Sequence, residues 1–226
     1  AREKGLQPLA DYLLEQKSGE VETFAGQFLN EELAVNTLEE ALAGARDIIA
    51  ETIAEDAEVR AQLRKVFLDK GNFVSRVVPG KEEQAQKYKD YFEWSEPLDK
   101  APSHRVLAMR RGEKEELLYL DIEVDEDFVV PKIESIYIKG KNDASKQVEL
   151  ALYDGYKRLL KPSMETEIRV LTRQRADEEA IKVFADNVRQ LLLGAPLGQK
   201  RLLAIDPGFR TGCKTVVLDA QGNLLE

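Results

Sequence analysis

Residues 177–206 read DEEAIKVFADNVRQLLLGAPLGQKRLLAID, and the spacing of the apolar residues changes within this stretch. Asp177 can cap a helix, and apolar residues at helical spacing follow it. That apolar face comprises Ile181, Phe184, Val188, Leu191 and Leu192, with Val183 beside it. Residues 194–198 are typical of a linker, and an apolar strand ending in Asp206 comes next. The stretch therefore predicts a helix, a break and a strand, and we place a domain boundary at the linker.

Asp206 stands at the tip of the predicted strand, before a turn with Gly208 and Gly212 and a second apolar strand. A carboxylate beside the exposed N–H groups of such a turn suits a Mg²⁺ ligand that shares a phosphate-bearing substrate. Asp before Pro-Gly is also typical of a plain turn, in which the carboxylate accepts backbone N–H groups. The residues themselves leave both interpretations open. Asp219 falls in the next predicted hairpin turn, and Cys213 is expected to be a small core residue.

Most of the chain before this stretch predicts helices, so the expected fold class is mainly α, a multi-helical scaffold with a few short strands. The expected helices are two short ones within 6–29, then 36–53, 56–71, 82–92, 104–111, 145–160, 165–171 and 177–193. Alternating residues predict strands at 73–78 and 117–124, whereas 129–138 suits either a strand or a short helix.

Local signals predict several helix ends. Asn36 with Glu39 has the spacing of a capping box, and Gly71 suits a left-handed helix terminus. Ser103 is expected to cap the helix that Gly112 ends. Pro162 is expected to stop the helix before it, because proline lacks the N–H that a helix interior requires.

Charge and composition limit the classes of function. The 226 residues carry a net charge of −9, and residues 1–70 hold 8 Lys/Arg against 15 Asp/Glu. Proteins that bind nucleic acid on their own usually show a basic footprint, so we expect such contacts from the later residues or from regions outside this chain. We see no apolar run long enough for a membrane span and no export signal, and one cysteine fits a reducing compartment. These features predict a cytoplasmic protein without a membrane partner.

Other chemistry-bearing residues give weaker signals. His104 is the only histidine, which argues against a histidine-rich metal site or a Ser-His-Asp triad. Arg105, Arg110 and Arg111 share one predicted helix and favour ion pairing over phosphate binding. The aromatic residues Tyr88, Tyr91, Phe92 and Trp94 favour core packing over base stacking. We therefore expect no metal site and no cofactor.

Several motifs resemble the bacterial transcription accessory protein Tex family. Residues 204–208 and 210–214 resemble the opening of that family's RNase H-like, YqgF-type domain. Further similar motifs occur in the family's order at 42–48, 81–83, 90–92, 102–105, 111–112 and 176–184. The resemblance covers nearly the whole chain. It implies an interior piece of a large cytoplasmic protein, in which helix-hairpin-helix units and an OB-fold RNA-binding domain follow the YqgF-type domain.

We expect a helical N-terminal region at 1–95, a helical region with a small β element at 96–198 and, after the linker, a third region at 199–226. The resemblance implies that this third region is the incomplete start of the RNase H-like α/β domain. It implies a non-catalytic scaffold segment of a nucleic-acid-binding transcription accessory protein. RNA or DNA would be bound mainly through domains absent from this chain, and the transcription machinery is a further partner. Asp206 would be a vestigial acid. Arg210 and Lys214 would be the nucleic-acid contacts if this domain binds phosphate, and surface charges that pair locally if it does not.

Two alternatives remain open. The first is a metal-dependent nuclease of the RNase H/resolvase type, with Asp206 as its first metal ligand. Such chemistry needs further carboxylates from other elements. The second is an actin-like phosphotransferase, since those folds also begin with a strand, an acid and a Gly-rich turn.

Overall fold

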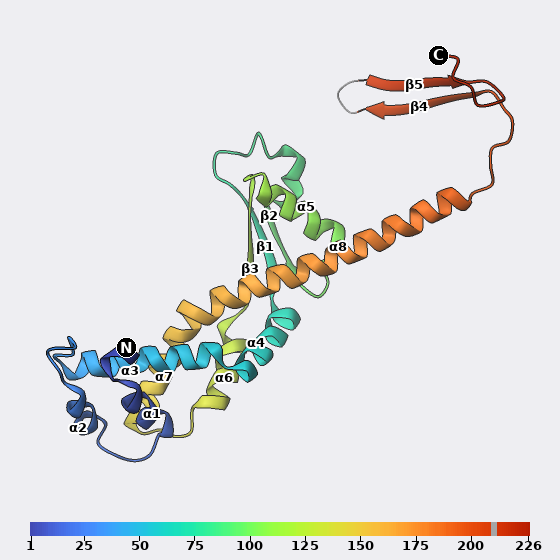
Figure 1. Ribbon diagram of the computed structural model, residues 1–226. Helices are drawn as coiled ribbons and strands as arrows, with labels where there is room; N and C mark the ends of the chain where they lie inside the picture. Colours follow the sequence, from blue (N-terminus) through green and yellow to red (C-terminus); the bar gives the residue numbers. More distant parts are fainter. Residues whose placement is uncertain (209–211) are drawn as a thin grey trace. The chain divides into compact units, whose positions relative to one another are not determined.

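The computed structural model describes residues 1–208 and 212–226, which form two compact units, Ala1–Ala180 and Ile181–Glu226. Helices dominate and a few short antiparallel strands accompany them (Figure 1), so the expected mainly α fold is confirmed. The division between the units falls inside one helix, α8 (Lys161–Leu193). The domain limits that the sequence suggests, after residues 95 and 198, stay a prediction.

A 3-10 turn (Arg2–Lys4) and then four α-helices open the first unit. α1 (Gln7–Glu15) and α2 (Val21–Ala25) lie where the apolar spacing of residues 6–29 predicts them, and a 3-10 turn (Gly26–Phe28) extends α2. α3 (Leu38–Glu55) and α4 (Ala57–Lys70) follow. The predicted start of α4 is confirmed, because the Asp56 carboxylate accepts the N–H groups of Glu58 and Val59 at 2.7 and 3.2 Å.

The predicted start of α3 is wrong by one residue. Thr37 rather than Asn36 is the cap, and Glu40 rather than Glu39 completes the capping box. The Thr37 hydroxyl accepts the N–H of Glu40 at 3.2 Å, and the Glu40 carboxylate accepts the N–H of Thr37 at 3.2 Å. Both residue pairs have the same spacing, so local geometry rather than the motif decides between them.

Gly71 ends α4 without the predicted left-handed conformation, since its φ is −75° and its backbone is extended. Close packing explains why this position holds a glycine. A Cβ at this position would lie 2.4 Å from the carbonyl oxygen of Phe67 and 2.9 Å from the Leu98 side chain.

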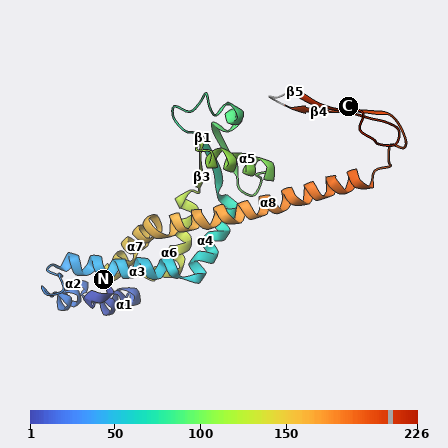
Figure 2. The same ribbon diagram turned by 45° about the horizontal axis from the view of Figure 1, so that its top comes forward.

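Helix packing forms the larger part of the first unit. α3 packs along α7 (Asp143–Gly155), with α1 against both (Figure 2). The α3 and α7 backbones meet at Gly155, where a Cβ would lie 3.1 Å from the Cα and Cβ of Ala50. Residues 129–138 belong largely to a helix, α6 (Glu126–Tyr137), which packs on α4 (Figure 1).

A three-stranded antiparallel sheet has β1 (Asn72–Val77) at its centre, between β2 (Glu93–Pro97) and β3 (Leu118–Glu123). The two strands predicted at 73–78 and 117–124 are confirmed. β3 alternates as expected, with Leu118, Leu120 and Ile122 buried. Sequence reasoning missed β2, whose charged residues and terminal proline obscure the alternation.

The helix predicted at 82–92 is wrong. Turns and a 3-10 helix (Gln86–Tyr91) occupy this segment, and Tyr88 leaves helical geometry with φ −114° and ψ 15°. α5 (Ser103–Lys114) does form, but Ser103 makes no capping hydrogen bond and Gly112 does not end the helix. A Cβ on Gly112 would lie 2.5 Å from the Leu118 side chain, so this glycine allows β3 to pack closely against α5.

Pro162 does not stop the preceding helix. A π-helical turn (Tyr156–Leu160) joins α7 to α8, and Pro162 is the second residue of α8. In a π-helical turn the backbone hydrogen bonds span five residues instead of four. This changes which N–H groups need a partner, so the helix tolerates a proline, which has no N–H, at the next turn. The helices predicted at 165–171 and 177–193 are both parts of α8.

One continuous apolar core joins these elements. Its largest fully buried side chains include Tyr156, Phe67, Phe73, Ile48, Ile49 and Leu63. α8 contributes Met164, Ile168, Thr172 and Ala176, spaced by four residues along one face. Burial of these side chains anchors the first part of α8 in the first unit.

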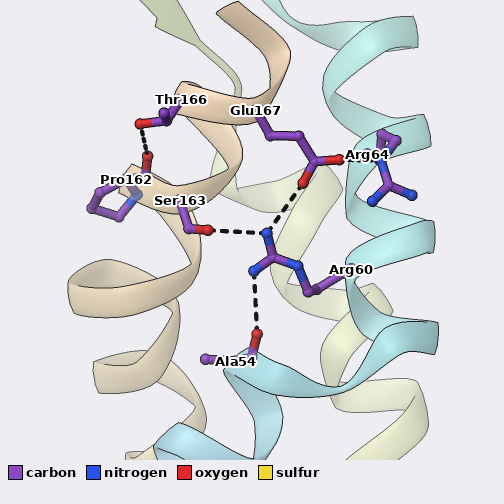
Figure 3. A network of polar contacts seen from close by, with 7 residues as sticks. All are labelled: Ala54, Arg60, Arg64, Pro162, Ser163, Thr166 and Glu167. Carbon is purple, nitrogen blue, oxygen red and sulfur yellow. Dashed lines mark hydrogen bonds and ion pairs between the residues drawn. The ribbon is translucent and has the colours of Figure 1, made fainter. Parts of the chain in front are cut away.

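Polar contacts tie α8 to α4 beside that core (Figure 3). The Arg60 guanidinium donates to the Ser163 hydroxyl at 3.0 Å, the Glu167 carboxylate at 3.1 Å and the Ala54 carbonyl at 3.3 Å. Arg64 also bonds to the Glu167 carboxylate. Burial raises the pKa of Glu167, but the hydrogen bonds and charges of Arg64 and Arg60 outweigh it and lower the pKa overall.

The second unit contains the last part of α8 and a hairpin of β4 (Leu202–Gly208) and β5 (Gly212–Leu218). The predicted helix of residues 177–193 forms, but its apolar face is exposed, with Phe184 at 69% and Leu191 at 81%. None of the helices in the described residues has the length and apolar character needed to cross a bilayer.

Candidate functional site

Asp206 lies within β4 rather than at its end, because the strand continues through Pro207 to Gly208. In the antiparallel register Asp206 faces Lys214 of β5. Directly paired residues lie on the same face of a hairpin, so the sequence-predicted acid and the sequence-predicted base are neighbours. Both side chains are exposed. Arg210, the third residue of the predicted site, lies outside the described residues.

After β5, hydrogen bonds within residues 219–223 confirm the turn predicted there. The Asp219 carboxylate accepts the N–H groups of Gln221 and Asn223 at 2.9 and 2.8 Å, and the Asn223 side-chain amide donates to it at 2.9 Å. Hydrogen bonds from the Asn223 side chain and backbone lower the pKa of Asp219. Asp219 therefore serves the turn.

Cys213 does not occupy the predicted core position. It pairs with Pro207 across the hairpin and is exposed. Leu203 and Ile205 on the same face are also exposed, at 59% each, so this apolar face of the hairpin is uncovered. In the part of the chain that the structure describes, no group of three or more His, Cys, Asp or Glu side chains is placed to hold a metal ion.

The aromatic residues singled out in the sequence pack as expected. Tyr88 is buried in a small cluster with Ala85, Leu117 and Leu118. The rings of Tyr91 and Trp94 meet edge to face, with centroids 6.1 Å apart. The Arg105 guanidinium lies 5.0 Å from the Trp94 ring centroid and 3.0 Å from the Glu96 carboxylate. These contacts serve packing and ion pairing rather than an open stacking platform.

The three arginines of α5 have different surroundings. Arg105 pairs with Glu96, as predicted, whereas Arg111 is exposed. Arg110 points toward α8 and donates to the backbone carbonyl of Arg169. Sequence reasoning missed this meeting of α5 and α8, because it joins residues far apart in the chain. The four-residue spacing of Arg169 and Arg173 was the only available signal that both lie on one helix face.

The comparisons with known proteins identify the family of this chain. The family described as Tex central region-like matches residues 16–184, and the chain belongs to that family. "Protein tex" of Bordetella pertussis is 38% identical over 241 residues and "Transcriptional accessory protein Tex" of Neisseria gonorrhoeae is 37% identical over 232 residues. "S1 RNA-binding domain-containing protein 1" of Homo sapiens is 27% identical over 240 residues.

Each of these matches includes 100% of this chain, but the chain spans only 30% of the two bacterial relatives and 24% of the human one. The similarity therefore concerns one segment of much longer proteins. It extends through the β4–β5 hairpin, beyond the residues that define the central-region family.

Proposed function

We propose that this chain is a non-catalytic scaffold segment of a cytoplasmic, Tex-like transcription accessory protein that binds nucleic acid mainly through other regions. Support for the family comes from the match to residues 16–184. The printed names of the relatives connect them with transcription and with RNA binding through an S1 domain. The scaffold role rests on how this chain uses its charges.

Many basic side chains of the first unit are engaged with its own acidic side chains. Arg46 pairs with Glu39, Arg60 and Arg64 share Glu167, and Arg158 contacts both Asp47 and Asp154. Arg76 and Lys87 also make ion pairs, with acids of β3 and of the segment after α5. A nucleic-acid site needs cations that can neutralise phosphates. This internal pairing, together with the net charge of −9, is the observation that carries the scaffold assignment.

The exposed apolar face in the second unit supports the same role. Ile181, Phe184, Leu191 and Leu192 are each more than half exposed along α8. Large exposed apolar patches usually mark surfaces that other protein covers. We infer that other regions of the longer protein cover this face, and that α8 thereby connects those regions to the packed core of the first unit.

Salt dependence of RNA binding tests the proposal. Fluorescence anisotropy with a labelled single-stranded RNA should show weak binding by residues 1–226. The slope of log K against log salt should correspond to no more than about one or two phosphate contacts. A steep slope with tight binding would instead identify an extended nucleic-acid surface on this segment and overturn the scaffold assignment.

The nuclease alternative keeps one supporting observation, the exposure of the Asp206 side chain on β4. It predicts Mg²⁺- or Mn²⁺-dependent cleavage of branched or hybrid nucleic acid by a full-length relative, lost when the residue matching Asp206 becomes Asn. The pairing of Asp206 with Lys214 favours a structural role, because opposite charges across an antiparallel pair stabilise a hairpin. Unchanged cleavage in the Asn variant would exclude Asp206 from catalysis.

A further inference from the structure

A surface groove of about 550 Å³ lies in the first unit where α5 meets α8. Its polar lining consists of Arg110, Thr166, Arg169, Arg173, Gln174 and Asp177. Arg110 comes from α5, and the other five share one face of α8. The groove therefore brings three guanidinium groups from two helices together.

The three arginines differ in how far their donors are satisfied. Arg169 is held on both sides, since it bonds to the carbonyl of Leu120 and to the carboxylate of Glu113. Arg110 bonds to the Arg169 carbonyl, but its buried Nε has no partner among the described residues. Buried polar groups are nearly always hydrogen-bonded, and this donor is one of five buried side-chain atoms in the described residues that have no partner. Of these five atoms, it is the one that belongs to a residue lining the groove.

Arg173 is the accessible cation of the groove. Its side chain is 66% exposed, and the one ion pair that it forms among the described residues, with Asp177, has an N–O distance of 3.5 Å. That distance is longer than a normal charge-assisted hydrogen bond. The neighbouring Gln174 side chain is exposed as well. Arg173 and Gln174 can therefore turn toward a ligand without breaking a strong contact.

The electrostatics of the groove favour an anion. Burial lowers the pKa of Arg110, and the nearby positive charge of Arg169 lowers it further, with a smaller contribution from Arg173. Glu113 and Asp177 act in the opposite direction, but they are two carboxylates facing three guanidinium groups. A bound anion would offset the mutual repulsion of the arginines.

We propose that this groove binds a phosphate group, with Arg110 and Arg173 as its principal ligands and Gln174 as a further donor. Guanidinium groups match phosphate well, because their planar donors can approach its oxygens from several directions. Here two guanidinium groups come from different helices, which suits a tetrahedral anion better than a planar carboxylate. This site is separate from the scaffold role, since a scaffold needs no ligand.

The test uses residues 1–226 and the variant Arg173→Gln, with Arg111→Gln as the matched control. Both substitutions remove one arginine charge, but Arg111 lies on α5 outside the groove and is exposed. Inorganic phosphate is titrated while the backbone amides of the groove residues are followed by NMR. A short labelled RNA and a poly-glutamate peptide are titrated separately. Circular dichroism melting verifies that each variant is folded.

The proposal predicts that Arg173→Gln weakens phosphate binding about tenfold, whereas Arg111→Gln has little effect. In the Arg173→Gln variant, added phosphate should change the NMR chemical shifts of the other groove residues only slightly. If RNA uses the same site, Arg173→Gln also lowers the salt slope of RNA binding by about one. If Arg173→Gln and Arg111→Gln bind RNA equally well, while Arg173→Gln alone weakens phosphate binding, the site is assigned to free phosphate. Equal phosphate affinity in both variants, or stronger binding of poly-glutamate than of phosphate, overturns the proposal.

Discussion

Glu167 shows how a single carboxylate connects two helices. It accepts hydrogen bonds from Arg60 and Arg64 of α4 while it lies on α8, with its side chain 26% exposed (Figure 3). Two positions earlier, Glu165 has the opposite environment. Burial raises the pKa of Glu165, and the charge of Asp121 adds to this effect. These neighbours on one helix therefore form a matched pair for substitution.

Glu167→Gln is expected to lower the free energy of unfolding by about 1–2 kcal/mol at neutral pH, because both arginines lose a charged partner. Glu165→Gln should be neutral or stabilising, since it removes a charge that burial disfavours. Chemical denaturation of the two variants measures both effects. A larger loss in Glu165→Gln than in Glu167→Gln would contradict the assignment of these environments.

The lowered pKa of Glu167 also predicts a pH dependence. A carboxyl group whose folded-state pKa lies below its unfolded value contributes stability above the unfolded pKa of about 4.3. The contribution is lost as the pH falls through the folded pKa. The stability difference between the original chain and Glu167→Gln should therefore shrink below about pH 4. Chemical denaturation at several pH values measures this difference in the free energy of unfolding. A difference that grows as the pH falls would be inconsistent with a lowered pKa of Glu167.

Gly155 provides a second prediction at the scale of one residue. Glycine inside a helix usually costs about 0.5–1 kcal/mol relative to alanine. Here the added methyl group would meet the Ala50 backbone at 3.1–3.2 Å, so Gly155→Ala should instead destabilise by about 1–3 kcal/mol. Gly26→Ala is the control, because its Cβ would make an ordinary 3.7 Å contact with Leu38. Thermal melts measure both variants. A higher melting temperature for Gly155→Ala than for the original chain would contradict the close approach of α3 and α7.

At the scale of elements, the two parts of α8 differ in what supports them. Met164, Ile168, Thr172 and Ala176 are buried in the first unit, whereas large apolar side chains from Ile181 to Leu193 are exposed. Tertiary packing provides most of the stability of protein helices, and regions with few buried contacts open more readily. The helix should therefore be protected unevenly along its length.

Amide hydrogen exchange tests this difference. Backbone amides near residues 164–176 should exchange through global unfolding, whereas those near residues 184–193 should exchange at least about tenfold faster through local opening. Mass spectrometry of peptides from each part measures the rates. Equal protection along α8 would show that the apolar face of its last part is covered in solution.

The elements also show what sequence patterns can and cannot predict. Strongly periodic segments such as α3, α4 and β3 are predicted well, because burial and the local pattern agree. Pro162 and Gly112 mislead, since their effect depends on a π-helical turn and on the approach of Leu118. β2 depends on its pairing with β1, a contact that its own residues do not encode.

The whole molecule combines an acidic first unit, in which many basic side chains form ion pairs, with a second unit of exposed apolar surface. The sequence predicts the pairing of Arg105 and the turn at Asp219, because each involves residues close together in the chain. It does not predict the groove of Arg110, Arg169 and Arg173, which requires α5 to meet a helix about 60 residues later. The placement of Asp206 opposite Lys214 follows from strand register, which the hairpin pattern suggests only approximately.

RNA affinity measured side by side for residues 1–226 and for a full-length relative, such as the Bordetella pertussis "Protein tex", tests the scaffold assignment most directly. The same labelled RNA and the same salt concentration are used for both proteins. The account predicts that the full-length relative binds at least about a hundredfold more tightly, because its remaining regions would supply the cations that neutralise phosphates. Equal affinity of the two proteins would contradict it.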